Sequence, residues 1–167
     1  MNSNNLGNFS GFKAVLFDLD GVITDTAHYH FLSWRQIASE IGINIDEAFN
    51  ENLKGISRID SLKAILKYGN KNLSKDTFNA FLERKNELFL KYISVISPKD
   101  VFPGILDLLH DLKNFGIKIS LASNSKNGRT LLYKMELLDL FDYITDPSSL
   151  RSKPDPDIFL SAAGVLM

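Results

Sequence analysis

The chain has 167 residues, of which 44% are hydrophobic and 23% charged, and its formal net charge is −1. This composition is ordinary for a globular protein, and the length suits one domain or one domain with a small insert. The chain has no cysteine, which excludes disulfides, thiolate catalysis and thiolate metal sites, so any metal must be held by oxygen or imidazole.

Residues 1–11 are rich in asparagine, serine and glycine, and they lack the basic start and the apolar core of a signal peptide. We therefore predict a flexible leader at residues 1–11 and a cytoplasmic location. No basic stripe and no apolar run long enough to span a bilayer is present, so neither nucleic acid nor a membrane is an expected partner. We expect a monomer.

Short apolar runs rich in β-favouring residues alternate with helical patterns along most of the chain. The runs predict buried strands at residues 12–17, 117–121 and 143–145. Helices are predicted at residues 104–115, 128–137 and 156–163. The helix at 104–115 has one apolar face, and Gly116 is placed as its C-terminal cap. This alternation favours an α/β fold in which helices cover a parallel sheet.

A long segment after the first strand breaks the alternation and contains several helical patterns but no convincing strand. Its apolar stripes are Trp34, Ile37, Ala38 and Ile41, and then Phe78, Phe81, Leu82, Phe89 and Tyr92. We interpret the second stripe as the core of a small helical cap. The predicted organisation is therefore a leader (1–11), an α/β core (12–26 and 98–167) and an α-helical cap domain (27–97).

Two carboxylates, Asp18 and Asp20, directly follow the first predicted strand. The carboxyl end of a strand in an open parallel sheet is where ligands bind. Carboxylates two residues apart repel each other, and a divalent cation on oxygen ligands is the usual compensation. The alternative is a turn rich in aspartate and glycine without a ligand.

Three short motifs resemble the haloacid dehalogenase superfamily. Residues 17–22, Phe-Asp-Leu-Asp-Gly-Val, are similar to its first motif, Ser123 at the end of the second strand to its second, and Lys153 to its third. They occur in the family's order, each after a predicted strand or loop. The resemblance implies the Rossmann-like parallel-sheet core of that superfamily, with the helical cap inserted after the first strand.

The resemblance also implies an enzyme that transfers phosphoryl groups through an aspartyl phosphate, with Mg²⁺ as cofactor. Asp18 would attack phosphorus and hold Mg²⁺ through its carboxylate. Asp20 would act as general acid and base and hold Mg²⁺ through its backbone carbonyl. Ser123, Asn124 and Lys153 would bind the transferring phosphoryl group.

Within this superfamily the chain resembles the β-phosphoglucomutase family over nearly its whole length. The likeness is carried by residues 12–26, Tyr29, His30, Trp34, residues 53–61, residues 84–86, residues 97–98 and residues 123–128. It implies interconversion of β-glucose 1-phosphate and glucose 6-phosphate through β-glucose 1,6-bisphosphate. The expected partners are therefore small sugar phosphates.

A bisphosphate intermediate needs a second anion site besides the site of transfer. Arg58 in the cap is the candidate anchor, because guanidinium binds phosphate through two parallel hydrogen bonds. The resemblance adds Ser125, Lys126 and Asn127, which stand near the predicted start of a helix. Ser125 or Asn127 could instead cap that helix, and Arg58 could be an exposed helix charge.

Supporting roles follow from the resemblance for Thr26, His30, Trp34, Lys54, Ser61 and Lys85. His30 would help to position Asp20 near the hinge, unless it is a solvated helix histidine. Thr26 would hydrogen-bond Asp20 or simply cap the first cap helix. Lys85 would approach the active site when the cap closes, unless it is solvated like most lysines on amphipathic helices. Trp34 is also consistent with a purely structural role.

The sequence departs from the family after Lys153, where the acidic pair of a fourth motif is not found. Asp155 and Asp157 belong to the third-motif loop and the helix that follows it. We therefore expect an incomplete core and a weakened Mg²⁺ site. Two alternatives to the mutase stay open: a sugar-phosphate phosphatase of the same superfamily, and an inactive truncated remnant.

Overall fold

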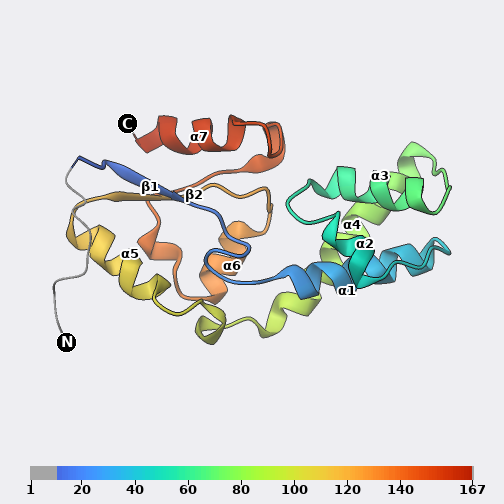
Figure 1. The fold of residues 1–167 in the computed structure, drawn as a ribbon, viewed down its shortest axis with the longest axis horizontal. Helices are drawn as coiled ribbons and strands as arrows, with labels where there is room; N and C mark the ends of the chain where they lie inside the picture. Colours follow the sequence, from blue (N-terminus) through green and yellow to red (C-terminus); the bar gives the residue numbers. More distant parts are fainter. Residues whose placement is uncertain (1–10, 167) are drawn as a thin grey trace.

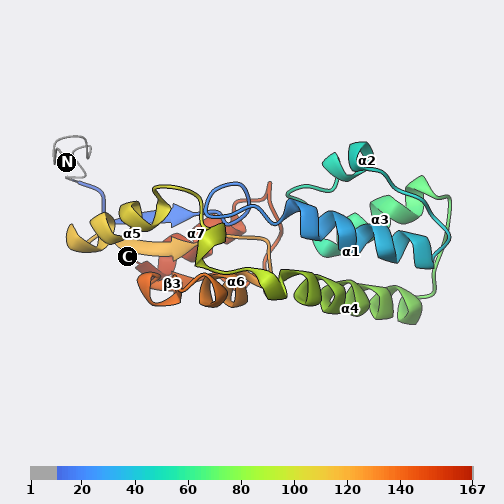
Figure 2. The same cartoon turned by 90° about the horizontal axis from the view of Figure 1, so that it is seen from below.

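A computed structural model describes residues 11–166, which contain three β-strands and seven α-helices arranged in two lobes (Figures 1 and 2). One lobe is built on the sheet and the other is entirely helical. The leader predicted at residues 1–11 lies outside the described residues except for Gly11. No helix within 11–166 combines the length and the apolar character needed to cross a membrane.

The sheet is parallel, and its strands follow in the order β1 (Ala14–Phe17), β2 (Lys118–Leu121) and β3 (Tyr143–Ile144). Ala14 pairs with Lys118 and Phe17 with Leu121, so β1 and β2 end at the same edge. The loops that follow the strands therefore meet at one edge, as the predicted α/β fold requires. The predicted strands and the fold class are confirmed.

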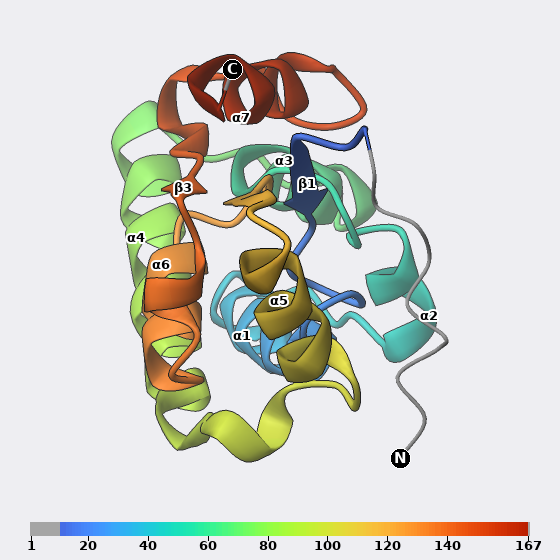
Figure 3. The same ribbon diagram turned by 90° about the vertical axis from the view of Figure 1, so that its left-hand side faces the viewer.

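Helices cover both faces of the sheet (Figure 3). α7 (Asp157–Leu166) lies on one face, and α5 (Ile105–Asn114) and α6 (Gly128–Lys134) lie on the other. Because alternate residues of a strand point to opposite faces, the two faces carry separate apolar clusters. Leu16 and Ala122 pack with Ile158 and Ala162 of α7. The larger cluster includes Phe17, Leu19, Leu109, Leu112, Ile119, Leu121, Leu131 and Leu132.

The structure confirms the helix predicted at 104–115 but shortens the one predicted at 128–137. Gly116 adopts a φ of 71° just after α5, which is the left-handed conformation that glycine allows at a helix end. α6 ends at Lys134 because Glu136 adopts a φ of 59°. The N–H of Leu137 then donates to the carbonyl of Leu132 at 2.9 Å and closes the helix end.

The helical lobe consists of α1 (Ala27–Glu40), α2 (Glu47–Glu51), α3 (Arg58–Tyr68) and α4 (Lys75–Tyr92). Serine side chains cap two of these helices at the N-terminus: Ser57 accepts the N–H of Asp60, and Ser74 accepts the N–H of Thr77. The lobe has its own apolar cluster, which includes Trp34, Ile37, Ile45, Leu53, Leu62, Ile65 and Leu88.

Phe89 differs from its neighbours in the aromatic stripe of α4. Phe78, Phe81 and Tyr92 pack in the cluster of the helical lobe, as predicted. Phe89 is fully buried in the cluster of the sheet lobe instead. Its placement as cap core was therefore wrong, because the helical period does not reveal which of two clusters a residue at the end of a long helix joins.

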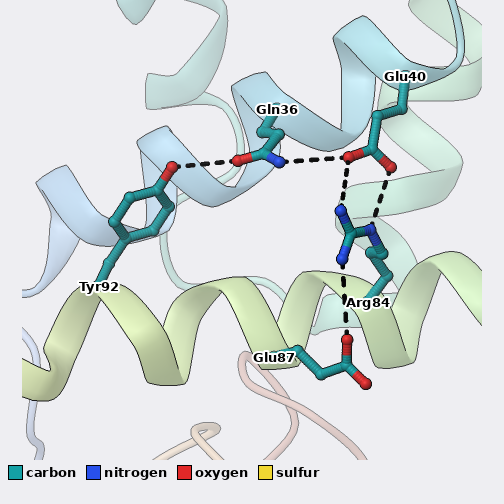
Figure 4. Close-up of polar contacts among 5 residues, drawn as sticks. All are labelled: Gln36, Glu40, Arg84, Glu87 and Tyr92. Carbon is teal, nitrogen blue, oxygen red and sulfur yellow. Dashed lines mark hydrogen bonds and ion pairs between the residues drawn. The ribbon is translucent and has the colours of Figure 1, made fainter.

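A row of polar side chains ties α4 to α1 (Figure 4). The Tyr92 hydroxyl donates to Gln36 at 3.1 Å, and the Gln36 amide donates to Glu40 at 3.3 Å. Arg84 contacts Glu40 at 3.3 Å and Glu87 at 3.9 Å. Exposed contacts of this kind each contribute little free energy. Together they favour one register between the two helices.

The two chain segments that connect the lobes lie side by side. The carbonyl of Ile23 accepts the N–H of Phe102 at 2.9 Å, and the buried hydroxyl of Thr24 donates to the carbonyl of Asp100 at 2.8 Å. The chain therefore enters and leaves the helical lobe at a single place.

Two buried threonines give a matched test of packing. Thr145 is 4% exposed, and its hydroxyl has no hydrogen-bond partner among the described residues, whereas Thr24 is 1% exposed and bonded. We expect Thr145→Val to raise the free energy of unfolding by up to about 1 kcal/mol, because an unsatisfied hydroxyl is removed. Thr24→Val should lower it by about 1–2 kcal/mol. Urea unfolding followed by circular dichroism measures both free energies. Equal losses of stability in the two variants would contradict the difference in hydrogen bonding between the two hydroxyls.

Candidate active site

A cavity of about 730 Å³ lies between the loops at the edge of the sheet and the helical lobe. Nearly all the residues predicted to form a site contribute to its wall. From the sheet lobe these are Asp18, Asp20, Ser123, Asn124, Ser125, Lys126, Asn127 and Lys153, and from the helical lobe His30, Trp34, Lys54, Arg58, Ser61 and Lys85. Thr26 does not line the cavity, but it is buried directly behind Asp20.

Asp18 stands immediately after β1 and forms an ion pair with Lys153. The Lys153 ammonium lies 2.9 Å from one carboxylate oxygen of Asp18, and the N–H of Leu19 donates to the other at 2.8 Å. Lys153 also lies over the ring of Phe159, 4.7 Å from its centre. A cation beside this carboxylate can balance the negative charge that a phosphoryl group would bring to the same place.

Asp20 opens onto the cavity, yet the surrounding protein removes much of its carboxylate from bulk water. This burial raises the pKa of Asp20, and the negative charge of Asp18 raises it further. A hydrogen bond from the Thr26 hydroxyl opposes the shift. Thr26 is the residue before α1, but its side chain makes no capping hydrogen bond, so of its two predicted roles the structure supports the bond to Asp20.

His30 and Lys85 contact each other inside the helical lobe. The two side-chain nitrogens, Nδ1 of His30 and Nζ of Lys85, are 2.7 Å apart, and His30 stacks on Phe89. The hydrogen-bond partner of His30 in this structure is therefore Lys85, and the role of His30 in positioning Asp20 stays a prediction. The alternative of a solvated lysine was wrong, because Lys85 is only 3% exposed and lies over the rings of Trp34 and Phe89.

The electrostatics of this pair follow from burial. Burial lowers the pKa of His30 well below its ordinary value, and the neighbouring charges of Lys85 and Arg58 act in the same direction. Burial also lowers the pKa of Lys85 to about 7, while the carboxylate of Asp20 opposes this shift. When Lys85 carries its proton it can only donate, so Nδ1 of His30 then accepts the hydrogen bond.

The loop after β2 is held by its own side chains. The Oγ of Ser123 accepts the N–H of Ser125 at 3.1 Å, and the Oγ of Ser125 accepts the N–H of Asn127 at 3.2 Å. Asn127 does not cap α6; its amide donates to Asn86 at 2.9 Å. Ser125 thus has a cap-like contact, whereas the amide of Asn127 reaches across to the helical lobe.

Positive charge gathers around the cavity. The Arg58 guanidinium donates to the carbonyl of Leu82 at 3.4 Å, and partial burial lowers the pKa of Arg58. It is therefore not merely an exposed helix charge. Lys126 comes from the sheet lobe and Lys54 from the helical lobe, where Lys54 pairs with Glu51 at 2.7 Å.

Two smaller predicted residues have mainly structural contacts. The Ser61 hydroxyl donates to the carbonyl of Ser57 at 2.9 Å inside α3, and Trp34 is 3% exposed. Both still reach the wall of the cavity.

Several wall residues were not predicted from the sequence. They include Asn50, Gly55, Ser57, Asn79, Glu83, Pro147, Ser148 and Ser152. Asn50 is a buried polar residue of α2, and its burial is visible only in the structure. The others are ordinary surface residue types, and only the packing of the lobes brings them to the cavity.

The third-motif loop also has an anchor that the sequence did not reveal. The Arg151 guanidinium binds Asp157 through two hydrogen bonds, at 2.7 and 2.8 Å, and contacts Asp155 at 2.8 Å. Asp155 and Asp157 are thus engaged within their own loop and helix.

The donors around Asp18 are of the type that Mg²⁺ prefers. Hard oxygen atoms of the Asp18 carboxylate and the Asp20 carbonyl suit this ion, which is usually held by one or two carboxylates together with phosphate and water. Within residues 11–166 no group of three or more histidine, aspartate or glutamate side chains converges on a point that could hold a metal ion. Mg²⁺ held by these two oxygen atoms would therefore take its remaining ligands from phosphate and water.

Comparison with known proteins agrees with this geometry. The family model of haloacid dehalogenase-like hydrolases matches residues 12–166. A β-phosphoglucomutase of Bacillus subtilis is 50% identical over 157 residues, which cover 92% of this chain and 70% of that protein. The chain therefore belongs to the haloacid dehalogenase-like hydrolase family, and the resemblance to β-phosphoglucomutases found in the sequence is confirmed.

Two further relatives place the chain within that family. The crystal structure of a β-phosphoglucomutase from Clostridium difficile superimposes with a TM-score of 0.89 at 46% identity, over 93% of this chain and 71% of that one. A phosphorylated carbohydrates phosphatase of Thermotoga maritima is 27% identical over 89% of this chain and 68% of that protein.

The buried lysine predicts a pH dependence of stability. The pKa of Lys85 is about 7 in the folded protein and about 10.5 when exposed, so between these values the unfolded state binds more protons. The free energy of unfolding of the native protein, relative to that of Lys85→Met, should therefore increase as pH rises from 7 towards 10. Urea unfolding across this range measures the difference, with Lys91→Met, an exposed lysine of the same helix, as control. A difference independent of pH would contradict the burial of an ionisable lysine.

Proposed function

We propose that the protein interconverts β-glucose 1-phosphate and glucose 6-phosphate through β-glucose 1,6-bisphosphate. The observation that carries the proposal is the Asp18–Lys153 ion pair, at 2.9 Å, in a cavity that also receives Arg58 and Lys126. A bisphosphate needs two such cationic regions, one at each phosphate. The 50% identity to the β-phosphoglucomutase of B. subtilis supports this choice of substrate.

In the proposed first step, a carboxylate oxygen of Asp18 attacks phosphorus of the bisphosphate and the bond to the sugar oxygen breaks. Asp20 gives its proton to the departing oxygen, and its raised pKa favours the protonated form that this needs. Lys153 and Ser123 hold the charged phosphoryl oxygens. The products are an aspartyl phosphate on Asp18 and a sugar monophosphate.

In the second step the other hydroxyl of a sugar monophosphate attacks the aspartyl phosphate. Asp20, now a carboxylate, takes the proton of that hydroxyl, and Asp18 is released. Arg58, Ser125, Lys126 and Asn127 anchor the phosphate that is not transferred. Because the same anchor serves either phosphate, the sugar can react in two orientations.

Mg²⁺ would be held by the Asp18 carboxylate and the Asp20 carbonyl, and when bound it would balance the charge of the transferring phosphoryl group.

We propose that residues 27–97 act as a cap that closes over the cavity, with the adjacent segments at residues 24–26 and 97–103 as the hinge. Closure would exclude water, which would otherwise hydrolyse the aspartyl phosphate. In this closed form Lys85 and His30 would lie beside Asp20.

A sugar-phosphate phosphatase is the second candidate, favoured by the similarity to the T. maritima phosphatase. It would use the same Asp18 and Asp20 but would transfer the phosphoryl group to water. The two functions differ in one measurable ratio, the glucose 6-phosphate formed against the inorganic phosphate released.

The deciding experiment supplies the full chain with Mg²⁺, β-glucose 1-phosphate and a trace of the bisphosphate. We expect glucose 6-phosphate to form well in excess of inorganic phosphate. Asp18→Asn should lower the rate at least about 1,000-fold, because the covalent route is lost. Phosphate release in excess of isomerisation would favour the phosphatase, and no turnover at all would contradict both candidates.

The anchoring role of Arg58 makes a separate prediction. Arg58→Ala should raise KM for β-glucose 1-phosphate about 10- to 100-fold, because charge-assisted hydrogen bonds to phosphate are lost. Hydrolysis of p-nitrophenyl phosphate, which has no second phosphate, should change less than about twofold if the bonds serve only the distal phosphate. Arg35→Ala, an exposed arginine outside the cavity, is the matched control. An equal loss on both substrates would contradict the assignment.

A further inference from the structure

The amide of Asn124 joins three segments that are distant in the chain. Its Nδ2 donates to the carbonyl of Gly55 at 2.8 Å, and its Oδ1 accepts the N–H of Lys153 at 3.1 Å. Gly55 lies in the loop between α2 and α3, and Lys153 lies in the third-motif loop. One side chain thus connects the loop after β2, the loop that presents Lys153 and the helical lobe.

A second amide of the same loop reaches the helical lobe at another point. Asn127 donates to Asn86 of α4 at 2.9 Å. Gly55 and Asn86 belong to different elements of the helical lobe, so the loop after β2 holds that lobe at two places. A single hydrogen bond would allow rotation about it, whereas two separated contacts define an orientation.

The hydrogen bonds that the Asn124 amide makes within the protein limit its predicted role in binding the phosphoryl group. An asparagine amide has one oxygen that accepts and one nitrogen with two hydrogens to donate. The oxygen faces the N–H of Lys153 and one hydrogen faces Gly55, so only one donor remains for a ligand. The contacts of Asn124 are mainly to the protein itself.

We propose that Asn124 is a positioning residue that makes the placement of Lys153 opposite Asp18 depend on closure of the helical lobe. When the lobe is closed, Gly55 holds the amide in the orientation that receives the N–H of Lys153. When the lobe moves away, the amide loses one of its two partners and turns freely, so the third-motif loop loses an anchor. The effect of Asn124 on turnover rests on the proposed function, whereas its contact between the lobes does not.

The contact can be tested without substrate because the chain has no cysteine of its own. Two exposed residues, Lys75 in the helical lobe and His110 in the sheet lobe, are replaced by cysteine and spin-labelled in the full chain. Pulsed electron paramagnetic resonance should give one narrow distance distribution. Adding Asn124→Ala or Asn86→Ala should broaden it and move it to longer distances.

Asn79→Ala is the matched control for this measurement, because Asn79 lies on the same helix as Asn86 and no contact of its side chain with the sheet lobe is described. It should leave the distance distribution unchanged. Asn124→Asp provides a second variant: it keeps the acceptor for Lys153 but removes the donor for Gly55, so its distribution should broaden as well. Distributions identical to the unsubstituted chain in both Asn124 variants would overturn the proposal.

The dependence of Lys153 on Asn124 needs a second readout. Asn124→Ala and Asn86→Ala should both open the lobe, but only Asn124 contacts the loop of Lys153. For hydrolysis of p-nitrophenyl phosphate, kcat should therefore fall about 10-fold in Asn124→Ala, the scale of losing one or two hydrogen bonds, and less than about twofold in Asn86→Ala. An equal kcat in the two variants would overturn the coupling to Lys153. If the unsubstituted chain does not turn over β-glucose 1-phosphate with Mg²⁺ and a trace of the bisphosphate, the proposed function fails. The distance measurement still decides whether Asn124 holds the lobe.

Discussion

The ion pair between Asp18 and Lys153 is the interaction on which the arrangement of the site depends. Asp18 follows β1 directly, whereas Lys153 arrives only after two further strands, so their contact requires all three strands to be parallel and in register. The Lys153 loop is itself anchored, on one side by Arg151 and on the other by Asn124. The fixed place of the Lys153 ammonium beside Asp18 therefore depends on the whole sheet lobe.

The helical lobe adds a second feature, because it holds the amino group of Lys85 away from water. Lys85 lies among Trp34, Phe89 and His30, and its lowered pKa reflects this burial. A site that must handle a phosphoryl group benefits from charges whose surroundings exclude water, because electrostatic interactions are stronger there. The polar row from Tyr92 to Glu87 keeps α1 and α4 in the register that this small cluster needs (Figure 4).

Much of the fold could be predicted from local pattern. The strands, the helix at 104–115 and the helical character of residues 27–97 follow from apolar periodicity. The end of α6 could not be predicted, because Glu136 adopts a left-handed conformation for which no glycine signals. The place of Phe89 could not be predicted either, because it depends on which lobe the last turns of α4 contact.

The sequence by itself determined the chemistry of the site: two carboxylates after a strand, a serine and a lysine in the order of the family's motifs, and an arginine in the cap. These are residue types whose reactivity and charge are properties of the side chain, so the resemblance to the family's motifs suffices to find them. Only the tertiary structure decided their partners. His30 contacts Lys85 rather than Asp20, and Asn124 spans both lobes, because hydrogen bonds depend on distances of about 3 Å that arise when segments far apart in the chain pack together.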